Sequence, residues 1–176
     1  MRLTLLVLAM SALAFSSPSR IEDECVSCSL DQDLLWPPNH VLVNVGLHVD
    51  AHVDPNATHT STVQIWSDED DVWPASGRFS PDASLACGTL RLRSERSGRG
   101  DGRVYLILVT VTDTVNGFSH PHYCVFTVVV PHDLSGASIA SVRAQAETAE
   151  TFWNANHVPP TGYFLVGNGP VIGPKQ

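Results

Sequence analysis

Apolar side chains recur at every second position through much of the chain between residues 34 and 133. The longest run covers residues 43–53, where valine, leucine and alanine alternate with polar residues and one glycine. Successive side chains of a β-strand point to opposite faces, so this period of two predicts one strand with a buried face. A helix would instead place apolar residues three to four positions apart.

Four shorter segments continue the pattern, over residues 62–67, 90–93, 103–112 and 123–130. The loops between them are rich in Gly, Pro, Ser and Asp, and residues 97–102 predict the tip of a hairpin. Several short strands with no helix between them predict an all-β sandwich rather than an α/β fold. The last two segments are expected to turn the following residues to one inner face: Tyr105, Ile107, Val109 and Val111, with Cys124, Phe126, Val128 and Val130.

The two ends of the chain differ in character from this centre. The first residues combine a charged start, an apolar run and the A-x-A site Ala12-Leu13-Ala14, the pattern of a cleaved signal peptide. No later stretch reaches the roughly 18 apolar residues of a transmembrane helix. Near the C-terminus, apolar residues three to four apart predict a short helix over 138–153 and a flexible tail after it. The expected division is a signal peptide over 1–14, a polar segment over 15–33, the β domain over 34–133 and an extension over 134–176.

The leader predicts export, and the charge of the chain limits its partners. The formal net charge is −8 at pH 7, and loss of Arg2 with the leader moves it to −9. A nucleic-acid binder needs an excess of Lys and Arg to neutralise phosphates, so nucleic acid is not expected as a partner. We expect a secreted or cell-surface protein, with association with the cell envelope as one option.

Export also decides how the cysteines are interpreted. Cys25, Cys28, Cys87 and Cys124 make an even number in an oxidising compartment, which indicates disulfides. Three pairings exist, and locality along the chain favours Cys25 with Cys28 and Cys87 with Cys124. A zinc site would need two close pairs of cysteines, and only Cys25 and Cys28 are close.

Five short motifs stand in the centre of the chain. They are WPPNH (36–40), SDE (67–69), LRLRSERSG with GRVY (90–98 and 102–105), VTD (111–113) and VPHD (130–133). With these motifs, the segment over 34–133 resembles the immunoglobulin-like modules of bacterial secreted and surface proteins, which are related in pattern to hyalin-repeat and cadherin-like domains. The resemblance implies an immunoglobulin-like β-sandwich of about seven strands, used as a spacer or adhesion element, with no catalytic residues.

An acidic run is the first candidate site. The acidic run ends one expected strand, and Asp113 ends another strand that is expected to lie beside the first. The pattern therefore predicts that carboxylates from both strands bind a hard cation such as Ca²⁺. The alternative is a solvated acidic loop, and the spacing does not match an EF-hand. The candidate ligands are Asp68, Glu69, Asp70, Asp71 and Asp113.

Histidines and arginines supply weaker candidates. His48 and His52 are too far apart on one strand to chelate a single ion, and His120 with His122 is interpreted as a loop pair. The arginines are expected to project outward between inward leucines, either toward an anionic glycan or toward the acidic loop. They are Arg91, Arg93, Arg96, Arg99 and Arg103, and residues 99–101 also spell the tripeptide Arg-Gly-Asp that integrins recognise.

No catalytic motif supports an enzyme. The chain contains no G-x-S-x-G elbow, H-E-x-x-H zinc motif, phosphate loop or dinucleotide fingerprint. We therefore expect a non-catalytic module for extracellular adhesion, binding or structural spacing, with an extracellular protein or glycan as partner and no cofactor except Ca²⁺. The alternative is a carbohydrate-binding accessory domain or a small secreted hydrolase that presents aromatics such as Trp66 and Trp73.

Overall fold

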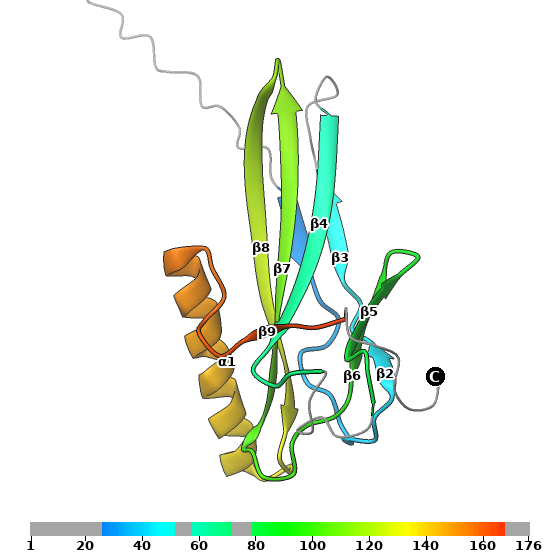
Figure 1. Ribbon diagram of the computed structural model, residues 1–176, viewed down its shortest axis with the longest axis vertical. Helices are drawn as coiled ribbons and strands as arrows, with labels where there is room; N and C mark the ends of the chain where they lie inside the picture. The colour runs from blue at the N-terminus through cyan, green and yellow to red at the C-terminus, as the bar shows by residue number, and fades with distance from the viewer. Residues whose placement is uncertain (1–25, 52–57, 72–78, 168–176) are drawn as a thin grey trace, which may run out of the picture.

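The computed structural model describes residues 26–51, 58–71 and 79–167. The expected signal peptide, Cys25, His52 and Trp73 lie outside the described residues. The fold is mostly β, with one helix of 21 residues near the C-terminus (Figure 1). Its elements are β1 (Val26–Ser29), β2 (Leu42–Asn44), β3 (His48–Ala51), β4 (Thr58–Ser67), β5 (Ala83–Ala86), β6 (Thr89–Arg93), β7 (Gly102–Val115), β8 (Phe118–Pro131), α1 (Gly136–Asn156) and β9 (Phe164–Leu165).

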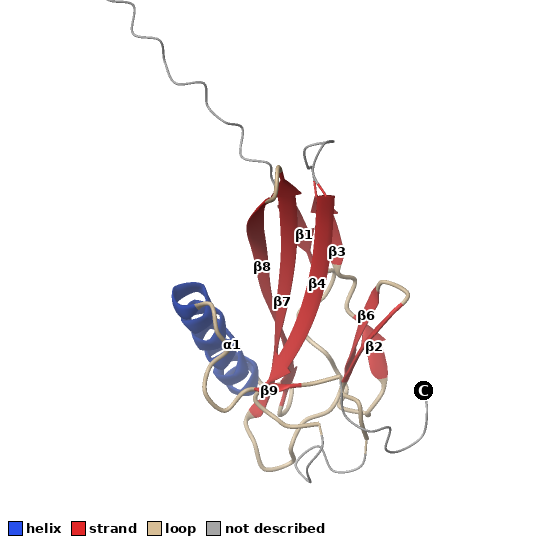
Figure 2. Ribbon diagram, turned by 45° about the horizontal axis from the view of Figure 1, so that its top comes forward, coloured by secondary structure: helices blue, strands red, loops and turns tan. Residues whose placement is uncertain are grey.

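The strands form three antiparallel sheets. The largest has the order β8-β7-β4-β9, the second β2-β6-β5, and the smallest pairs β1 with β3. Figure 2 shows β4, β7 and β8 as a long blade, with α1 along one face of its lower half. The two smaller sheets lie on the other side of the blade. The described strands thus form layers that support one another.

β7 is buried on both faces because it lies in the centre of the layers. Its odd-numbered residues from Tyr105 to Val111 belong to the main core, together with residues of β4, β5, β6 and β8. Its even-numbered residues face α1, where Val104 packs with Val142 and Leu106 lies in a cluster with Trp153. The predicted inner faces of β7 and β8 are therefore confirmed. The second buried face of β7 was not predicted.

The helix is confirmed and is slightly longer than expected. Ser135 caps its start, because the Oγ atom accepts a hydrogen bond from the amide of Ser138 at 3.2 Å. At its end, His157 takes the left-handed conformation and its amide donates to the carbonyl of Trp153. The buried residues follow a spacing of three to four: Val142, Ala146, Ala149 and Trp153. No helix within the described residues is both long and apolar enough to cross a membrane.

The predicted long strand over 43–53 is wrong, because the chain breaks at Gly46. This glycine has a φ of 65°, and a Cβ atom there would clash with the side chain of Asp31. The segment is therefore divided into β2 and β3, which belong to different sheets. Uninterrupted alternation in the sequence could not reveal a turn that tertiary packing imposes on one glycine.

The predicted hairpin at 97–102 is also wrong. This turn connects β6 to β7, and those strands belong to different sheets, so it is a crossover between layers. The long hairpin is instead β7 with β8, joined through Asn116 and Gly117, both at positive φ. The dipeptide Asn-Gly between two alternating segments is the strongest short-range hairpin signal, and it was available in the sequence.

The two favoured pairings, Cys25 with Cys28 and Cys87 with Cys124, are both wrong. Cys28 on β1 forms the disulfide with Cys124 on β8, with a Cα–Cα distance of 6.2 Å and a sequence separation of 96. Both cysteines pack against the main core, so β1 crosses the inner face of β8 there. Cys87 is an exposed free thiol in the turn between β5 and β6. Locality failed because the partner is set by which strands meet across the core.

Candidate functional site

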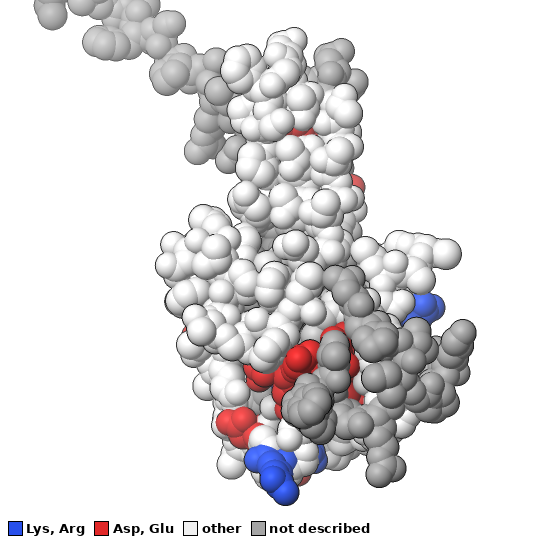
Figure 3. Space-filling model, in the orientation of Figure 1, with Lys and Arg blue, Asp and Glu red and all other residues white. Residues whose placement is uncertain are grey.

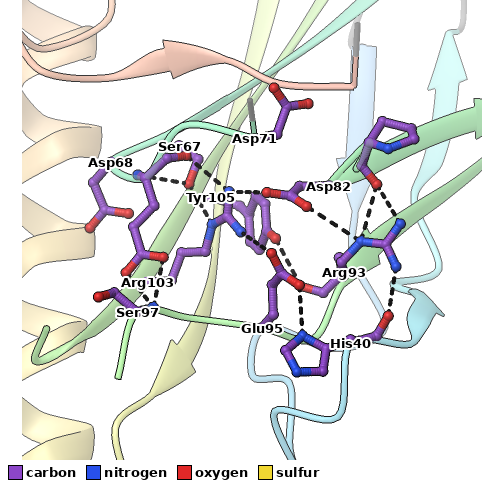
Figure 4. Close-up of polar contacts among 12 residues, drawn as sticks. His40, Ser67, Asp68, Asp71, Asp82, Arg93, Glu95, Ser97, Arg103 and Tyr105 are labelled. Atoms are coloured by element: carbon purple, nitrogen blue, oxygen red, sulfur yellow. Dashed lines mark hydrogen bonds and ion pairs between the residues drawn. The ribbon is translucent and has the colours of Figure 1, made fainter. Parts of the chain in front are cut away.

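A buried ion cluster lies at the lower end of the main core, where β4, β6 and β7 come together (Figure 4). Arg103, on β7, is fully buried at its centre. Its Nη2 atom lies 2.6 Å from Asp82 Oδ2 and donates to the carbonyl of Glu69 at 2.9 Å. Its Nε atom donates to Ser67 Oγ at 2.8 Å, and the guanidinium lies over the ring of Tyr105. A buried charge is tolerated only with partners of this kind.

Arg93, on β6, is the second buried cation of the cluster. Its Nε atom lies 3.3 Å from Asp82 Oδ1, so Asp82 sits between the two arginines. Nη1 donates to the carbonyl of His40 at 2.6 Å, and Nη2 donates to the carbonyl of Pro81 at 2.8 Å. The hydroxyl of Tyr105 closes the group by donating to the carbonyl of Arg93. The cluster thus connects β6 of the three-stranded sheet with β7 of the four-stranded sheet.

Glu95 is the most perturbed carboxyl of the group. It is buried beside Arg103 Nη1, at 3.7 Å, and Oε2 lies 2.8 Å from His40 Nδ1. Burial, followed by the nearby charge of Asp82, raises the pKa of Glu95 to about 8, and the two arginines only partly oppose this effect. Burial and the charge of Arg93 lower the pKa of His40. Glu95 therefore carries a proton near neutral pH.

Three carboxylates of the acidic run, those of Asp68, Glu69 and Asp71, accept hydrogen bonds from backbone amides. Asp68 Oδ1 accepts from the amide of Val104 at 2.9 Å, and both carboxylate oxygens of Glu69 accept from the amide of Ser97. Burial raises the pKa of Asp68 and of Glu69. Asp71 is buried as well, and its Oδ2 accepts from the amide of Gly167. These carboxylates hold loops in place.

The predicted Ca²⁺ site is not assembled in this structure. Asp113 pairs with His59 near the far end of β4, whereas Ser67, just before the acidic run, pairs with Tyr105 at the other end of the same two strands. The side chain of Asp113 is therefore a strand's length away from Asp68, Glu69, Asp70 and Asp71. Within the part of the chain that is described, no three His, Cys, Asp or Glu side chains are arranged to hold a metal ion.

Four of the five sequence motifs meet in and around the cluster. The motif 36–40 joins it through His40, and through Pro37, whose carbonyl accepts from Ser94 Oγ at 2.7 Å. The motif 130–133 joins through Arg96, which donates to the carbonyls of Pro131 and His132. The motifs 67–69, 90–98 and 102–105 supply Ser67, Arg93, Glu95, Arg103 and Tyr105, whereas Asp82 belongs to no motif. The motif 111–113 is the exception, because it lies at the far end of β7.

The outward orientation predicted for Arg93 and Arg103 is wrong. Both side chains are buried, and they point into the layer between the sheets. The acidic loop was expected to supply carboxylates for these arginines, but Arg103 pairs with Asp82 and Glu95, and Glu69 contributes only its backbone carbonyl. Sequence reasoning missed Asp82 and Glu95, because neither stands in an acidic run and both reach the arginines only through folding. Alternation suggested outward arginines because it takes no account of paired charges in a core.

The centre of the cluster is closed to solvent, while His40 at its margin is partly exposed. Arg103, Asp82 and Glu95 have at most 1 % of their surface exposed. None of these three lines the grooves found on the surface of the described chain. What the arrangement can do is fix the position of two sheets and three loops relative to each other.

A second polar group lies near the far end of the blade. Asp113 is buried between two histidines, with Oδ1 2.9 Å from His59 Nδ1 and Oδ2 3.4 Å from His122 Nε2. His120 and His122 belong to β8, so the predicted loop pair is wrong. The group joins three neighbouring strands, β4, β7 and β8, on the inner face of the blade.

The other candidate residues are dispersed. His48 lies on β3, 3.2 Å from Asp31. In the Arg-Gly-Asp turn, Arg99 and Asp101 are exposed, and the carboxylate of Asp101 accepts a hydrogen bond from Gln145 of the helix at 2.7 Å. Trp66 is partly buried in the cluster of Leu106, Leu108 and Trp153.

Comparisons with models of known protein families, with curated proteins and with solved structures found no match to this chain.

Proposed function

We propose that the chain is a non-catalytic, secreted or cell-surface module of the immunoglobulin-like β-sandwich class, used for extracellular binding or structural spacing. The observation that carries this proposal is the convergence of four motifs on a closed ion cluster. Because those motif residues are consumed by contacts within the fold, the pattern specifies a rigid framework. A reactive site would need the same groups to be open to a substrate.

Two further observations support an extracellular framework. The Cys28–Cys124 bridge crosses the core, and disulfides of this kind persist in oxidising compartments. The layers, with buried β7 between strands on one face and a helix on the other, provide a stiff body from which the blade extends (Figure 1). Rigid bodies with exposed ends suit spacing and adhesion.

The alternative function, glycan binding through aromatic rings, gains no support from the described residues. Trp66 packs among Leu106, Leu108 and Trp153, so it does not belong to a solvent-facing row. A carbohydrate-binding face would need several exposed rings in a plane. We therefore keep the framework function as the proposal.

Export and folding test the proposal together. The full chain, with its own leader, would be expressed in a bacterial host, and each cell fraction would be analysed by mass spectrometry with and without reduction. We expect a processed chain outside the cytoplasm with Cys28 joined to Cys124, and no turnover of ester, glycoside or peptide substrates. The proposal would be contradicted by a chain that stays in the cytosol with its leader attached and its thiols reduced. Turnover of any of these substrates would contradict it as well.

A further inference from the structure

One side of the molecule ends in strands whose outer edges have no strand partner among the described residues. β4 pairs with β7 along its length, but on its other edge it meets β9 only at Trp66 and Ser67. β3 ends the two-stranded sheet, and β5 ends the three-stranded sheet. The surface grooves next to β4 are lined by β3 and β5, so the three edges lie side by side (Figure 1). We call this surface, formed by residues 58–64 of β4 with β3 and β5, the open side.

The backbone groups that face the open side can be assigned. The amide of Val166 donates to the carbonyl of Ile65 at 2.9 Å, so the peptide groups of Ile65 point away from β7. In an antiparallel ladder this direction alternates from residue to residue, so His59, Ser61 and Val63 point the same way. Thr60, Thr62 and Gln64 point toward β7 and belong to its ladder. The open side therefore presents three successive pairs of N–H and C=O groups at regular intervals.

Apolar side chains border this row of backbone groups. Val49 on β3 is 39 % exposed, and Leu85 on β5 is 48 % exposed. Both line the same groove as Ser61 and Val63 of β4. Proteins usually protect an open edge with Lys, Pro or a bulge. Residues 58–64 contain no Lys, Arg, Asp, Glu or Pro, whereas the edge strand β8 has Pro121.

The chemistry of the open side fits a second copy of this chain. If a two-fold axis passes through Ser61, β4 of one copy pairs antiparallel with β4 of the other copy. The N–H groups of each strand then face the C=O groups of the other. β3 lies beside the earlier part of β4 and β5 beside the later part, so the same axis would bring Val49 of one copy toward Leu85 of the other. Both layers would continue across the axis.

The charge of the open side permits contact between two copies, because residues 58–64 of β4 carry no Lys, Arg, Asp or Glu, and Asp50 is the acidic residue that β3 adds. Each copy carries a formal net charge of −8, so acidic surfaces repel each other. Figure 3 shows Lys, Arg, Asp and Glu gathered around the lower part of the molecule, and an upper blade almost without them. We propose that the protein forms a two-fold dimer through the open side, with the β4 strands joined into one continuous sheet. This inference is independent of the proposed function.

Two measurements on the full mature chain test the dimer. Sedimentation equilibrium over a wide concentration range gives the mass, and amide hydrogen exchange by NMR reports each residue of β4. We expect a concentration-dependent dimer, with slow exchange for His59, Ser61 and Val63 as well as for Thr60 and Thr62. Leu85→Glu places a charge in the interface and should weaken self-association about tenfold or more. Phe118→Glu, the same change at a residue that is 71 % exposed on the hairpin tip, is the matched control.

A backbone variant separates the interface from the fold. Ser61→Pro removes an amide that faces the open side and leaves the β7 ladder intact, so it should abolish the dimer without unfolding the chain. A monomer at every concentration, with fast exchange at His59, Ser61 and Val63, overturns the proposal. Slow exchange of these amides in a monomer also overturns it, because another segment of the same chain would then cover the edge. Self-association that survives both Leu85→Glu and Ser61→Pro places the contact elsewhere and contradicts it equally.

Discussion

Replacing Glu95 by Gln should change how the stability of the protein depends on pH. The folded-state pKa of Glu95 is raised to about 8 from an ordinary value of 4.5, chiefly because the carboxyl is buried. Between these two pH values the folded chain keeps a proton that the unfolded chain has released. The free energy of unfolding must therefore fall as pH rises through this interval.

The size of the effect follows from proton linkage. One proton held by the folded state lowers the free energy of unfolding by up to ~1.4 kcal/mol for each pH unit. Over the whole interval the loss is no more than about 5 kcal/mol, a large fraction of the ~5–15 kcal/mol of a typical domain. Gln is neutral and nearly the same shape, so Glu95→Gln should resemble the wild type near pH 5 and exceed it in stability near pH 8.

Urea unfolding at several pH values between 5 and 9, followed by tryptophan fluorescence, measures this difference directly. Burial raises the pKa values of Asp68, Glu69 and Asp82 too, so only the difference between variant and wild type isolates Glu95. Glu147→Gln, on the exposed side of α1, is the matched control and should run parallel to the wild type. If Glu95→Gln also runs parallel, the arginines keep Glu95 ionised and our account of the cluster is incorrect.

Three further predictions concern the framework around the cluster. Replacing Cys28 and Cys124 together by serine removes a bridge with a sequence separation of 96 and should lower the free energy of unfolding by about 4–5 kcal/mol, measured in denaturant. Cys87→Ser should have little effect in the same assay, because this thiol is free. Trp153→Ala should lower the free energy of unfolding by about 3–5 kcal/mol, because the ring is buried against Leu106 and Leu108. Phe152→Ala, at a neighbouring residue that is 39 % exposed, should lower it much less in the same assay. Gly46→Ala should lower Tm by several degrees, because a side chain is strained at a φ of 65° and its Cβ atom would clash with Asp31. An unchanged Tm would show that the turn between β2 and β3 relaxes freely.

The elements with strong local patterns were predictable from the sequence. The inner faces of β7 and β8 follow the period of two, and α1 follows the helical spacing from Val142 to Trp153. Each of these elements is long, so one interruption does not hide the pattern. Short strands behave differently: β2 and β3 have three and four residues, and their sheet partners are chosen by tertiary contacts.

From the sequence, the motifs that surround the candidate site could be recognised, but the structural roles of their residues could not be predicted. Arg103, Glu95 and Asp82 come from three separate segments, and their distances exist only after β6 and β7 are placed in facing sheets. A sequence offers no signal that distinguishes a buried, paired arginine from a solvated one. The same reason explains the cysteine pairing, because the fold brings together two side chains with a sequence separation of 96.

The placement of the cluster gives the contact between the two sheets a directional element that apolar packing alone lacks. The main core holds the two facing sheets together through valine, leucine and isoleucine, which are non-directional and would tolerate a shift of one sheet over the other. Asp82, just before β5, bridges Arg93 on β6 and Arg103 on β7, and these contacts exist in a single arrangement of the sheets. Desolvation makes such a group a weak source of stability, but loss of one partner leaves an uncompensated charge. Any slippage between the sheets therefore carries that cost, and the cluster fixes their relative position at the end where the crossover between residues 97 and 102 joins them.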